Sequence, residues 1–406
     1  MQTNIKPLRI LLVTSKYNRP EQGPYLTNDL ANSWAADGHQ VQAISLEWDG
    51  VDRTECYSDG TVRVLRIGPF VTKKFGVLIE RLAKWALSSP LAMRTIRKEI
   101  GDDARYDLLV TMAPLVNLSS PLEWGLKRSA RSYVYNADFF PYYHRSIGLV
   151  PGGPIFHAVR LGEQRLLRKF DVIGCMSAAN IAFLKSHFRL AKGQRATALH
   201  LWGDTSAPPM PDRDAKRAQY GLPRDKAIAL FGGQLIHGRG IEDILGAAEL
   251  ARSEAPDLLF LFIGRGRLEP LITDYMARGG DNVRVIPPLP RDEYLSVASA
   301  CDIGVNATAA HVVVPTFPTK TIDYLRARIP IAASVEAASD YGEFVEDNGV
   351  GLTSPAGDPR ALLGILQRMA GDPAMRQRMR NAAQPTLDKY LDVRVAARSI
   401  IEDCFG

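Results

Sequence analysis

Apolar runs alternate with amphipathic segments along the whole chain. The first run, Leu8–Val13, is of the kind that forms a strand buried in a parallel sheet. Apolar residues then recur at helical spacing over Thr27–Ala36, and Val41–Ser45 restarts as a strand. This strand–helix–strand unit predicts a doubly wound α/β domain at the start of the chain.

The same alternation returns in the second half of the chain. Four short apolar runs there predict buried strands: Ile228–Phe231, Leu258–Ile263, Val283–Ile286 and Cys301–Val305. A proline-rich run between the two halves predicts a linker over residues 206–213. We therefore expect an N-terminal domain over 1–205, a C-terminal domain over 214–385 and a last helical segment over 386–406.

Composition narrows the class of protein. A length of 406 residues, at about 150 residues per domain, indicates two or three domains. The four cysteines are far apart, which argues against a disulfide framework or a zinc site and fits a reducing compartment. No apolar run approaches about 20 residues, and the run after Lys6 and Arg9 is too short for a signal peptide. We therefore expect a cytoplasmic protein with no spanning helix.

The most informative stretch is 311–334. A β-branched run leads to a turn rich in proline and threonine, and a helix is expected from Lys320 to the residues before Pro330. This places Thr319, Lys320 and Asp323 at or near a helix N-terminus, where free N–H groups and a lysine can hold a phosphate. Asp323 can accept hydrogen bonds from a ribose diol. The alternative is a surface helix capped by Thr319, with Asp323 as a dipole partner.

Two loops that contain glycine follow the first two expected strands of the second half. The first holds Gly233, Gln234 and Arg239, and the second holds Gly264 and Arg265. Glycines let a backbone approach a phosphate closely, and an arginine can contact it with two N–H groups. Together with the stretch 311–334, these loops predict a phosphate-binding edge in the C-terminal domain.

The N-terminal half has its own candidates. Gly23 lies in the loop after the first strand, and ligands bind beyond such strand ends. Asp138 directly follows an expected strand at 131–136, and His144 lies in the same loop. His144 can assist catalysis, although a histidine in a loop is more often structural or solvated.

The motifs resemble the N-terminal opening and the donor site of retaining glycosyltransferase family 4, whose bacterial polysaccharide enzymes have the GT-B fold. The segments that carry the resemblance are Gly38-His39-Gln40-Val41, Pro318-Thr319-Lys320, Asp323-Tyr324-Leu325 and Ile329-Pro330-Ile331. Many family members have two glutamates eight positions apart in this region. Here Asp323 stands in place of the second glutamate, and Pro315 in place of the first.

The resemblance implies two Rossmann-like domains that face a cleft, with the last helix packed back on the first domain. It implies transfer of a sugar from a nucleotide diphosphate sugar to a hydroxyl, with retention, in cell-surface polysaccharide or glycolipid synthesis. Asp138 would face the reaction cleft, with His144 as a second catalytic candidate. The implied donor-binding residues are Gly23, Gly233, Gln234, Arg239, Gly264, Arg265, Thr319, Lys320 and Asp323.

Other interpretations stay open. Sugar-nucleotide epimerases share this fold. A binding protein that lost the first glutamate would keep the fold without the transferase activity. No metal or other cofactor is expected. Asp212-Arg213-Asp214 resembles the Asp-x-Asp metal motif of a different transferase fold, but here it opens a helix, where acidic residues favour the helix dipole. We find no recognised nucleic-acid-binding motif in the sequence.

Residues 69–100 are strongly basic, with seven lysines and arginines against two glutamates. An apolar stripe with Phe75 and Trp85 lies opposite Arg81 and Lys84 on a helical wheel. Such a helix can lie in a membrane interface, and the alternative is a helix that packs on the core with a solvated basic side. We expect the first arrangement to bring a lipid-linked acceptor within reach, on the inner face of the cell membrane.

Overall fold

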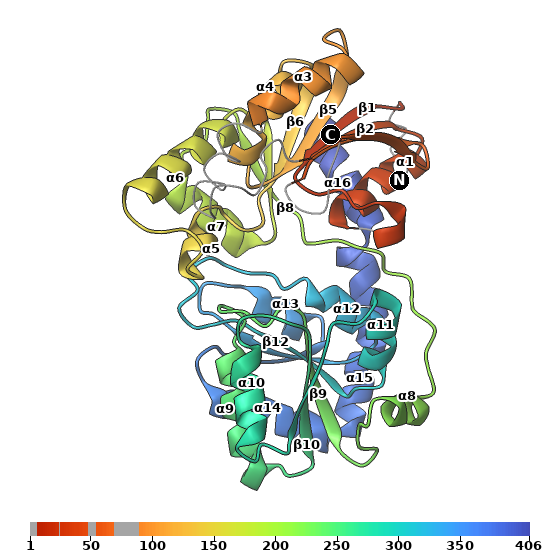
Figure 1. Cartoon of the computed structure of the whole chain (residues 1–406), viewed down its shortest axis with the longest axis vertical. Helices are drawn as coiled ribbons and strands as arrows, with labels where there is room; N and C mark the ends of the chain where they lie inside the picture. Colours follow the sequence, from red (N-terminus) through yellow and green to blue (C-terminus); the bar gives the residue numbers. More distant parts are fainter. Residues whose placement is uncertain (1–5, 24, 48–53, 69–88) are drawn as a thin grey trace. The chain divides into compact units, whose positions relative to one another are not determined.

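The chain divides into two units in the computed structural model (Figure 1), which describes residues 6–23, 25–47, 54–68 and 89–406. Unit 1 comprises Met1–Gly203 and Val393–Gly406, and unit 2 comprises Asp204–Asp392. Within the described ranges, no helix is both long and apolar enough to cross a bilayer.

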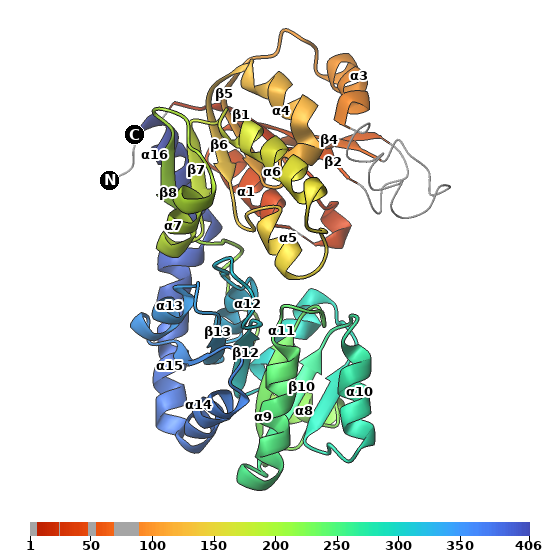
Figure 2. The ribbon, with the colours of Figure 1, turned by 90° about the vertical axis from the view of Figure 1, so that its left-hand side faces the viewer.

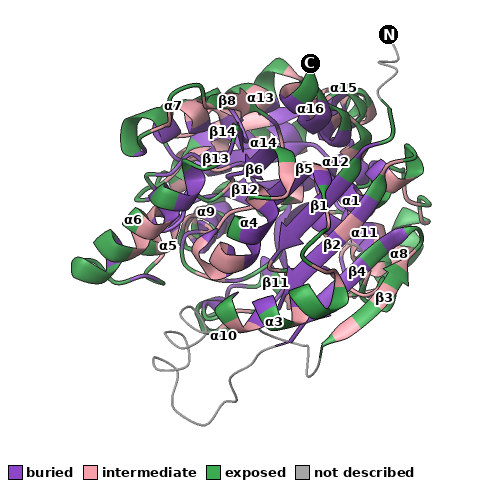
Figure 3. Ribbon diagram, turned by 90° about the horizontal axis from the view of Figure 1, so that it is seen from above, coloured by how far each residue is buried: buried purple, intermediate pink, exposed green. Residues whose placement is uncertain are grey.

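Unit 1 is built on a sheet of eight strands among the described residues, in the order β3-β4-β2-β1-β5-β6-β7-β8. All neighbouring strands are parallel except β3 and β4. The central strands β1, β2 and β5 are largely buried (Figure 3) because their residues are mostly aliphatic. The strands are β1 (Arg9–Thr14), β2 (Gln40–Leu46), β3 (Glu55–Asp59), β4 (Val62–Ile67), β5 (Tyr106–Met112), β6 (Ser129–Tyr135), β7 (Val172–Cys175) and β8 (Arg195–Ala198).

Helices lie in the connections β1–β2, β5–β6, β6–β7 and β7–β8, and the strand order reverses between β1 and β5, as in a doubly wound domain. The chain end returns to this unit: Trp34 Nε1 donates to the Ala397 carbonyl at 3.0 Å, which holds α16 on α1. The helical segments are η1 (Pro20–Gln22), α1 (Leu26–Ala36), α3 (Ser89–Glu99), η3 (Val116–Leu118), α4 (Ser119–Leu126), α5 (Tyr142–Ser146), α6 (Pro154–Leu167), α7 (Ala178–His187) and α16 (Val393–Phe405).

Unit 2 has six described strands, all parallel, in the order β11-β10-β9-β12-β13-β14. Counted along the chain this is 3-2-1-4-5-6, the order of a Rossmann domain with its switch point between β9 and β12. The strands are β9 (Ala227–Gly232), β10 (Leu258–Ile263), β11 (Val283–Ile286), β12 (Ile303–Ala307), β13 (Ile331–Val335) and β14 (Gly351–Pro355).

Helix α9 packs against α14 beside this sheet (Figure 2), over a core that includes Phe231, Phe260 and Phe262. The helical segments are α8 (Arg213–Gln219), α9 (Ile241–Glu254), α10 (Glu269–Ala277), α11 (Arg291–Ser299), α12 (Lys320–Arg326), α13 (Tyr341–Asp347), α14 (Pro359–Gly371), α15 (Pro373–Thr386) and the π-helical turn η4 (Leu387–Leu391). The expected α/β class with two doubly wound sheets is therefore confirmed.

The unit boundaries differ from the expected domain limits. The divisions fall at Gly203/Asp204 and Asp392/Val393, whereas the sequence suggested 205/206 and 385/386. The reason is local bonding: Thr205 Oγ1 donates to Asp392 Oδ2 at 2.8 Å, so both residues belong to unit 2. The expected linker 206–213 ends early, because Asp212 Oδ1 accepts from the Ala215 amide at 3.0 Å and caps α8.

The basic segment 69–100 is only partly described. Its apolar stripe with Phe75 and Trp85 falls in 69–88, outside the described residues. The rest lies mostly in α3, where Ala92, Met93 and Ile96 are buried and the last turn carries Arg97 and Lys98.

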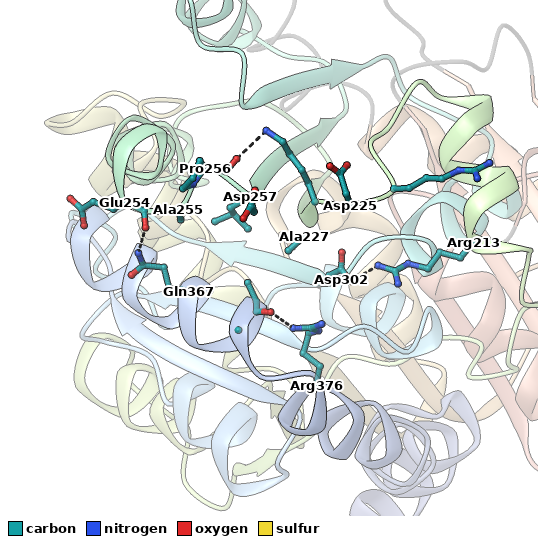
Figure 4. Close-up of a pocket in the computed structure, with 15 residues that line it drawn as sticks. Arg213, Asp225, Ala227, Glu254, Ala255, Pro256, Asp257, Asp302, Gln367 and Arg376 are labelled. Atoms are coloured by element: carbon teal, nitrogen blue, oxygen red, sulfur yellow. Dashed lines mark hydrogen bonds and ion pairs between the residues drawn. The ribbon is translucent and has the colours of Figure 1, made fainter.

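A charged cavity of about 470 Å³ lies at the amino ends of the unit 2 strands (Figure 4). Asp302 accepts from Arg213 Nη2 and Arg217 Nη2, both at 2.6 Å, and from the Ile228 amide at 2.8 Å. Arg217 is fully buried and also donates to the Ala300 carbonyl at 2.9 Å. This network holds α8 on the sheet, and none of the predicted site residues lines the cavity.

Candidate active site

The predicted donor residues meet at the carboxyl edge of the unit 2 sheet. A cavity of about 490 Å³ opens there, beyond β9, β10 and β12. Seven of the nine predicted donor-binding residues line it: Gly233, Gln234, Gly264, Arg265, Thr319, Lys320 and Asp323. This edge, at the switch point of the strand order, is where doubly wound sheets bind their ligands.

Two of these residues are glycines because the loops touch through their backbones. The Gly233 amide donates to the Ile263 carbonyl at 2.9 Å, and the Leu235 amide donates to the Arg265 carbonyl at 2.9 Å. A Cβ added to Gly264 would lie 1.8 Å from the Gly233 carbonyl oxygen. Any side chain at 264 would therefore push the two loops apart and alter the floor of the cavity.

Lys320 is the first residue of α12, as expected, but its side chain is held rather than mobile. Its Nζ lies 4.0 Å from the centroid of the Phe231 ring, a cation–π contact. Burial, and then the nearby charge of Arg239, hold the pKa of Lys320 well below its ordinary value. Arg239 does not line the cavity itself, and it acts from the glycine loop that precedes α9.

This depressed pKa predicts that diphosphate binding takes up a proton. A bound diphosphate favours the ammonium form and raises the pKa of Lys320, so a proton enters at pH values between the free and bound pKa. Affinity should accordingly fall as the pH rises from the free pKa to the bound pKa of Lys320, and level off above the bound pKa. Calorimetric titration with inorganic pyrophosphate at mildly alkaline pH, in two buffers of different ionisation enthalpy, measures the uptake. Lys320→Arg should bind without it, because arginine stays charged; equal uptake in that variant would contradict the assignment.

Asp323 has a partner that the sequence did not suggest. Arg291 Nη2 lies 2.8 Å from Asp323 Oδ1, in an ion pair between α11 and α12. Burial raises the pKa of Asp323 against the opposing charges of Arg291 and Arg326. The pair fixes the carboxylate at the cavity wall. The one sequence signal for Arg291 is its position at the start of a helix that follows the proline-rich loop 287–290.

Thr319 does not cap α12 with its side chain. It occupies the N-cap position with helical backbone angles (φ −60°, ψ −27°), and its hydroxyl makes no capping hydrogen bond. The interpretation of this turn as an ordinary capped helix is therefore wrong for Thr319. Its exposed side chain lines the cavity instead.

A buried glutamate organises the loop between β12 and α12. Glu336 Oε1 accepts from the amide and the hydroxyl of Thr316, both at 2.8 Å, and Oε2 accepts from the Thr308 hydroxyl. Glu336 is 2% exposed, and burial raises its pKa. Pro315, which stands in place of the family's first glutamate, lies in this loop. Sequence reasoning missed Glu336, whose only signal is its position at the end of a buried strand.

In unit 1 the structure brings Asp138 and His144 together. Burial lowers the pKa of His144, and the charge of Asp138 opposes this shift. Asp138 is exposed. Burial of Tyr25 raises the pKa of that phenol, and the charge of Asp138 raises it further. Between Asp138 and His144, Phe139 has a φ of +44°, a strained value for an aromatic residue.

Gly23 lies in the loop after β1, at the same carboxyl edge of the unit 1 sheet. It has a φ of +74°, which favours glycine, and its carbonyl accepts from Asn18 Nδ2 at 2.9 Å. The structure thus brings Asp138 and His144 together in unit 1, with Gly23 at the same edge of the sheet, and gathers seven of the donor-binding candidates around one cavity in unit 2.

Part of the chain matches a known family model. Residues 212–386 match the model of "Glycosyl transferases group 1". The "Putative colanic acid biosynthesis glycosyl transferase WcaI" of Escherichia coli (strain K12) is 22% identical over 396 residues, across 89% of this chain and 92% of WcaI. The "Probable glycosyltransferase WbjE" of Pseudomonas aeruginosa is 27% identical over 166 residues, across 40% of either protein, so this match spans less than half of that relative.

Solved structures match over nearly the whole chain. Sucrose-phosphate synthase from Thermosynechococcus elongatus superposes with a TM-score of 0.70 at 18% identity, across 97% of this chain and 98% of that one. Anabaena Alr3699/HepE in complex with UDP-glucose superposes with a TM-score of 0.66 at 16% identity, across 98% and 99%. The chain therefore has the GT-B fold, and residues 212–386, most of its unit 2, match the group 1 glycosyltransferase model.

Proposed function

We propose that this protein transfers a sugar from a nucleotide diphosphate sugar to a hydroxyl acceptor with retention at the anomeric carbon, as enzymes of family 4 do. The observation that carries the proposal is the cavity at the switch point of unit 2, which Lys320 and Asp323 line. The HepE structure, which contains UDP-glucose, supports a nucleotide sugar as the donor. The name of WcaI supports a role in polysaccharide synthesis.

The chemistry follows from the charges around the cavity. Cleavage of the sugar–phosphate bond leaves a diphosphate, whose developing charge needs cations and N–H donors already in place. Lys320 and Arg265 line the cavity, Arg239 lies close enough to act on Lys320, and Gln234 adds an amide. These groups supply the charge that the step needs, and we propose that no metal takes part. Activity unchanged by a chelator is the expected result.

The nucleoside would occupy the rest of the cavity. Asp323, held by Arg291, would accept hydrogen bonds from the ribose hydroxyls through its free oxygen. Pro288, Leu289 and Tyr294 form an apolar wall that suits the base. The ribose and the diphosphate would thus be recognised from opposite ends of the first turn of α12.

Asp138 is the proposed contact of unit 1 with the reacting groups. Asp138→Asn should lower turnover by about 10²-fold or more, the usual contribution of a group in general acid–base catalysis. Asp323→Asn should instead raise the nucleotide dissociation constant with a smaller change in turnover. Steady-state kinetics with varied donor separates the two effects. Unchanged turnover in Asp138→Asn would make this residue structural.

Two other functions can be separated in one assay. A sugar-nucleotide epimerase would convert the donor without an acceptor, and a binding protein would leave it intact. Incubation with UDP-, GDP-, ADP- and dTDP-sugars, with cell-envelope lipid extract as acceptor, distinguishes the outcomes. Release of nucleoside diphosphate that depends on the extract supports transfer. Epimer formation, or no product with any donor, would contradict it.

The acceptor is proposed to be lipid-linked, reached from an anionic membrane on the cytoplasmic side. The charge excess of residues 69–100 motivates this, since each cation near such a surface is worth about 1 kcal/mol. A variant that neutralises Lys73, Lys74, Arg81 and Lys84 should lose sedimentation with anionic vesicles, and salt should weaken wild-type binding. The control neutralises four exposed arginines of unit 2: Arg252, Arg278, Arg328 and Arg368. No wild-type binding at low salt would exclude this docking.

A further inference from the structure

The helix that carries the donor residues is bonded at its other end to the point where the chain enters unit 2. Helix α12 has seven residues: Lys320 begins it, Asp323 lies one turn on, and Arg326 ends it. Arg326 Nη2 lies 2.8 Å from Asp204 Oδ2, and Arg326 Nε donates to the Ser206 carbonyl at 3.0 Å. One guanidinium therefore connects the end of α12 to the first residues of the unit.

The arginine is held in place by burial. The Arg326 side chain is 8% exposed, whereas that of Asp204 is 49% exposed. Asp204 is oriented in turn by the amide and hydroxyl of Ser206, at 2.9 Å and 2.7 Å. A buried charge whose partner is removed is costly, so this contact resists being broken while the rest of the unit stays folded.

The second segment that connects the units joins the same network. Thr205 Oγ1 donates to Asp392 Oδ2 at 2.8 Å, and Gln384 Nε2 donates to the Thr205 carbonyl at 3.3 Å. Asp392 is the last residue of unit 2, so both chain connections between the units are bonded to one another at residues 205 and 392. Displacement of either connection thus reaches α12 through Asp204, Ser206 and Arg326.

The donor end of α12 is linked to Arg326 as well. Asp323 and Arg326 are three residues apart and so lie on the same side of the helix. The charge of Arg326 helps to lower the pKa of Asp323 against the effect of burial. Between them, the Tyr324 hydroxyl accepts from the Gly232 amide at 3.1 Å and so attaches the helix to the cavity at β9.

We propose that Arg326 is a positioning residue that couples occupation of the donor cavity to the order of residues 203–206. The inference rests on the proposed function, because it takes the cavity at Lys320 as a diphosphate site. None of residues 203–206 lines that cavity, so a response of this segment to a ligand reports transmission through α12 and not contact. Coupling of this kind is reciprocal: loss of the Arg326 contact must also weaken ligand binding.

Hydrogen exchange of the whole chain, with and without saturating inorganic pyrophosphate, tests the proposal. Pyrophosphate needs no particular base, so the unknown nucleotide does not affect the result. In the wild type, amides in 232–240 and 319–326 should exchange more slowly with pyrophosphate. Amides in 203–206 should slow as well, by roughly fivefold or more, the lower end of usual coupling factors.

Arg326→Gln should keep the protection of the cavity loops at saturation, lose the protection of 203–206, and bind pyrophosphate roughly fivefold more weakly. Asp204→Asn changes the other partner at an exposed position and should give the same result. This second variant keeps the test decisive if Arg326→Gln does not fold. Arg360→Gln, which breaks the exposed pair of Arg360 with Glu254 in the same unit, is the matched control and should behave as wild type.

The outcomes are distinct. Protection of the cavity loops without any change in 203–206 of the wild type overturns the coupling and leaves the donor site standing. Persistent protection of 203–206 in both variants overturns the role of Arg326. Absence of protection in the cavity loops removes the donor-site assignment, and the inference falls with it.

Discussion

Replacing Lys320 by alanine should weaken binding of a nucleoside diphosphate by about 10- to 150-fold. Replacing Arg239 by alanine should weaken it by less, because Arg239 does not line the cavity. A charge-assisted hydrogen bond to phosphate contributes about 1.5–3 kcal/mol, and every 1.4 kcal/mol is tenfold in affinity. Lys320 lines the cavity with its Nζ against the Phe231 ring, so its position is already fixed before a ligand arrives. Fluorescence or calorimetric titration with the nucleoside diphosphate of the accepted donor measures the change.

The two residues should not contribute independently. Arg239 is one cause of the depressed pKa of Lys320, so its removal lets Lys320 charge more readily and offsets part of the loss. The double variant should therefore bind more weakly than the sum of the single effects predicts. Arg278→Ala, an exposed arginine of the same unit, is the control. Wild-type affinity in both single variants would remove this cavity as the diphosphate site.

Arg217→Ala should lower the free energy of unfolding of unit 2 by about 3–5 kcal/mol, because it leaves the buried Asp302 carboxylate without its buried partner. Arg217 is fully buried, and it donates to Asp302 at 2.6 Å and to the Ala300 carbonyl at 2.9 Å. Its loss leaves both acceptors without this donor in the interior. Urea unfolding followed by far-UV circular dichroism measures the effect on the whole chain.

Tryptophan fluorescence provides an internal reference in the same urea titration. All five tryptophans of the sequence fall in unit 1, so their fluorescence follows the unfolding of that unit alone. The transition measured by fluorescence should be the same in Arg217→Ala and in the wild type. Arg213→Ala removes the other arginine bound to Asp302, but its side chain is 47% exposed. Its loss should cost about 1 kcal/mol or less. Equal losses in the two variants would mean that burial does not set the strength of this network.

The sequence predicted the central strands of unit 2 well because they are buried on both faces. The apolar run Leu258–Ile263 coincides with β10, all of whose residues are buried. The run Val283–Ile286 coincides with β11, although only Val283 of that edge strand is buried. The hairpin β3–β4 was missed, since β3 is an edge strand whose residues are all at least partly exposed.

The sequence likewise predicted some residues of the candidate site and missed others. Residues whose chemistry is local, such as the glycines and Lys320 at the turn before α12, were predicted because loop and helix motifs place them. Three roles depend on contacts between distant segments and were not predicted. They are the ion pair of Arg291, the effect of Arg239 on the pKa of Lys320, and the hydrogen bonds of Glu336. An arginine at a helix start has no special meaning until α12 lies beside it, and a motif does not report which side chains a fold brings together.

The most direct test of the account is the structure of the protein with the nucleoside diphosphate of the accepted donor soaked into crystals. Diphosphate oxygens are expected within hydrogen-bond distance of Lys320 Nζ, close to the backbone at Gly233, with the ribose hydroxyls on Asp323. A nucleotide bound elsewhere, such as in the charged cavity around Asp302, with no contact between Lys320 and phosphate, would contradict the donor-site assignment.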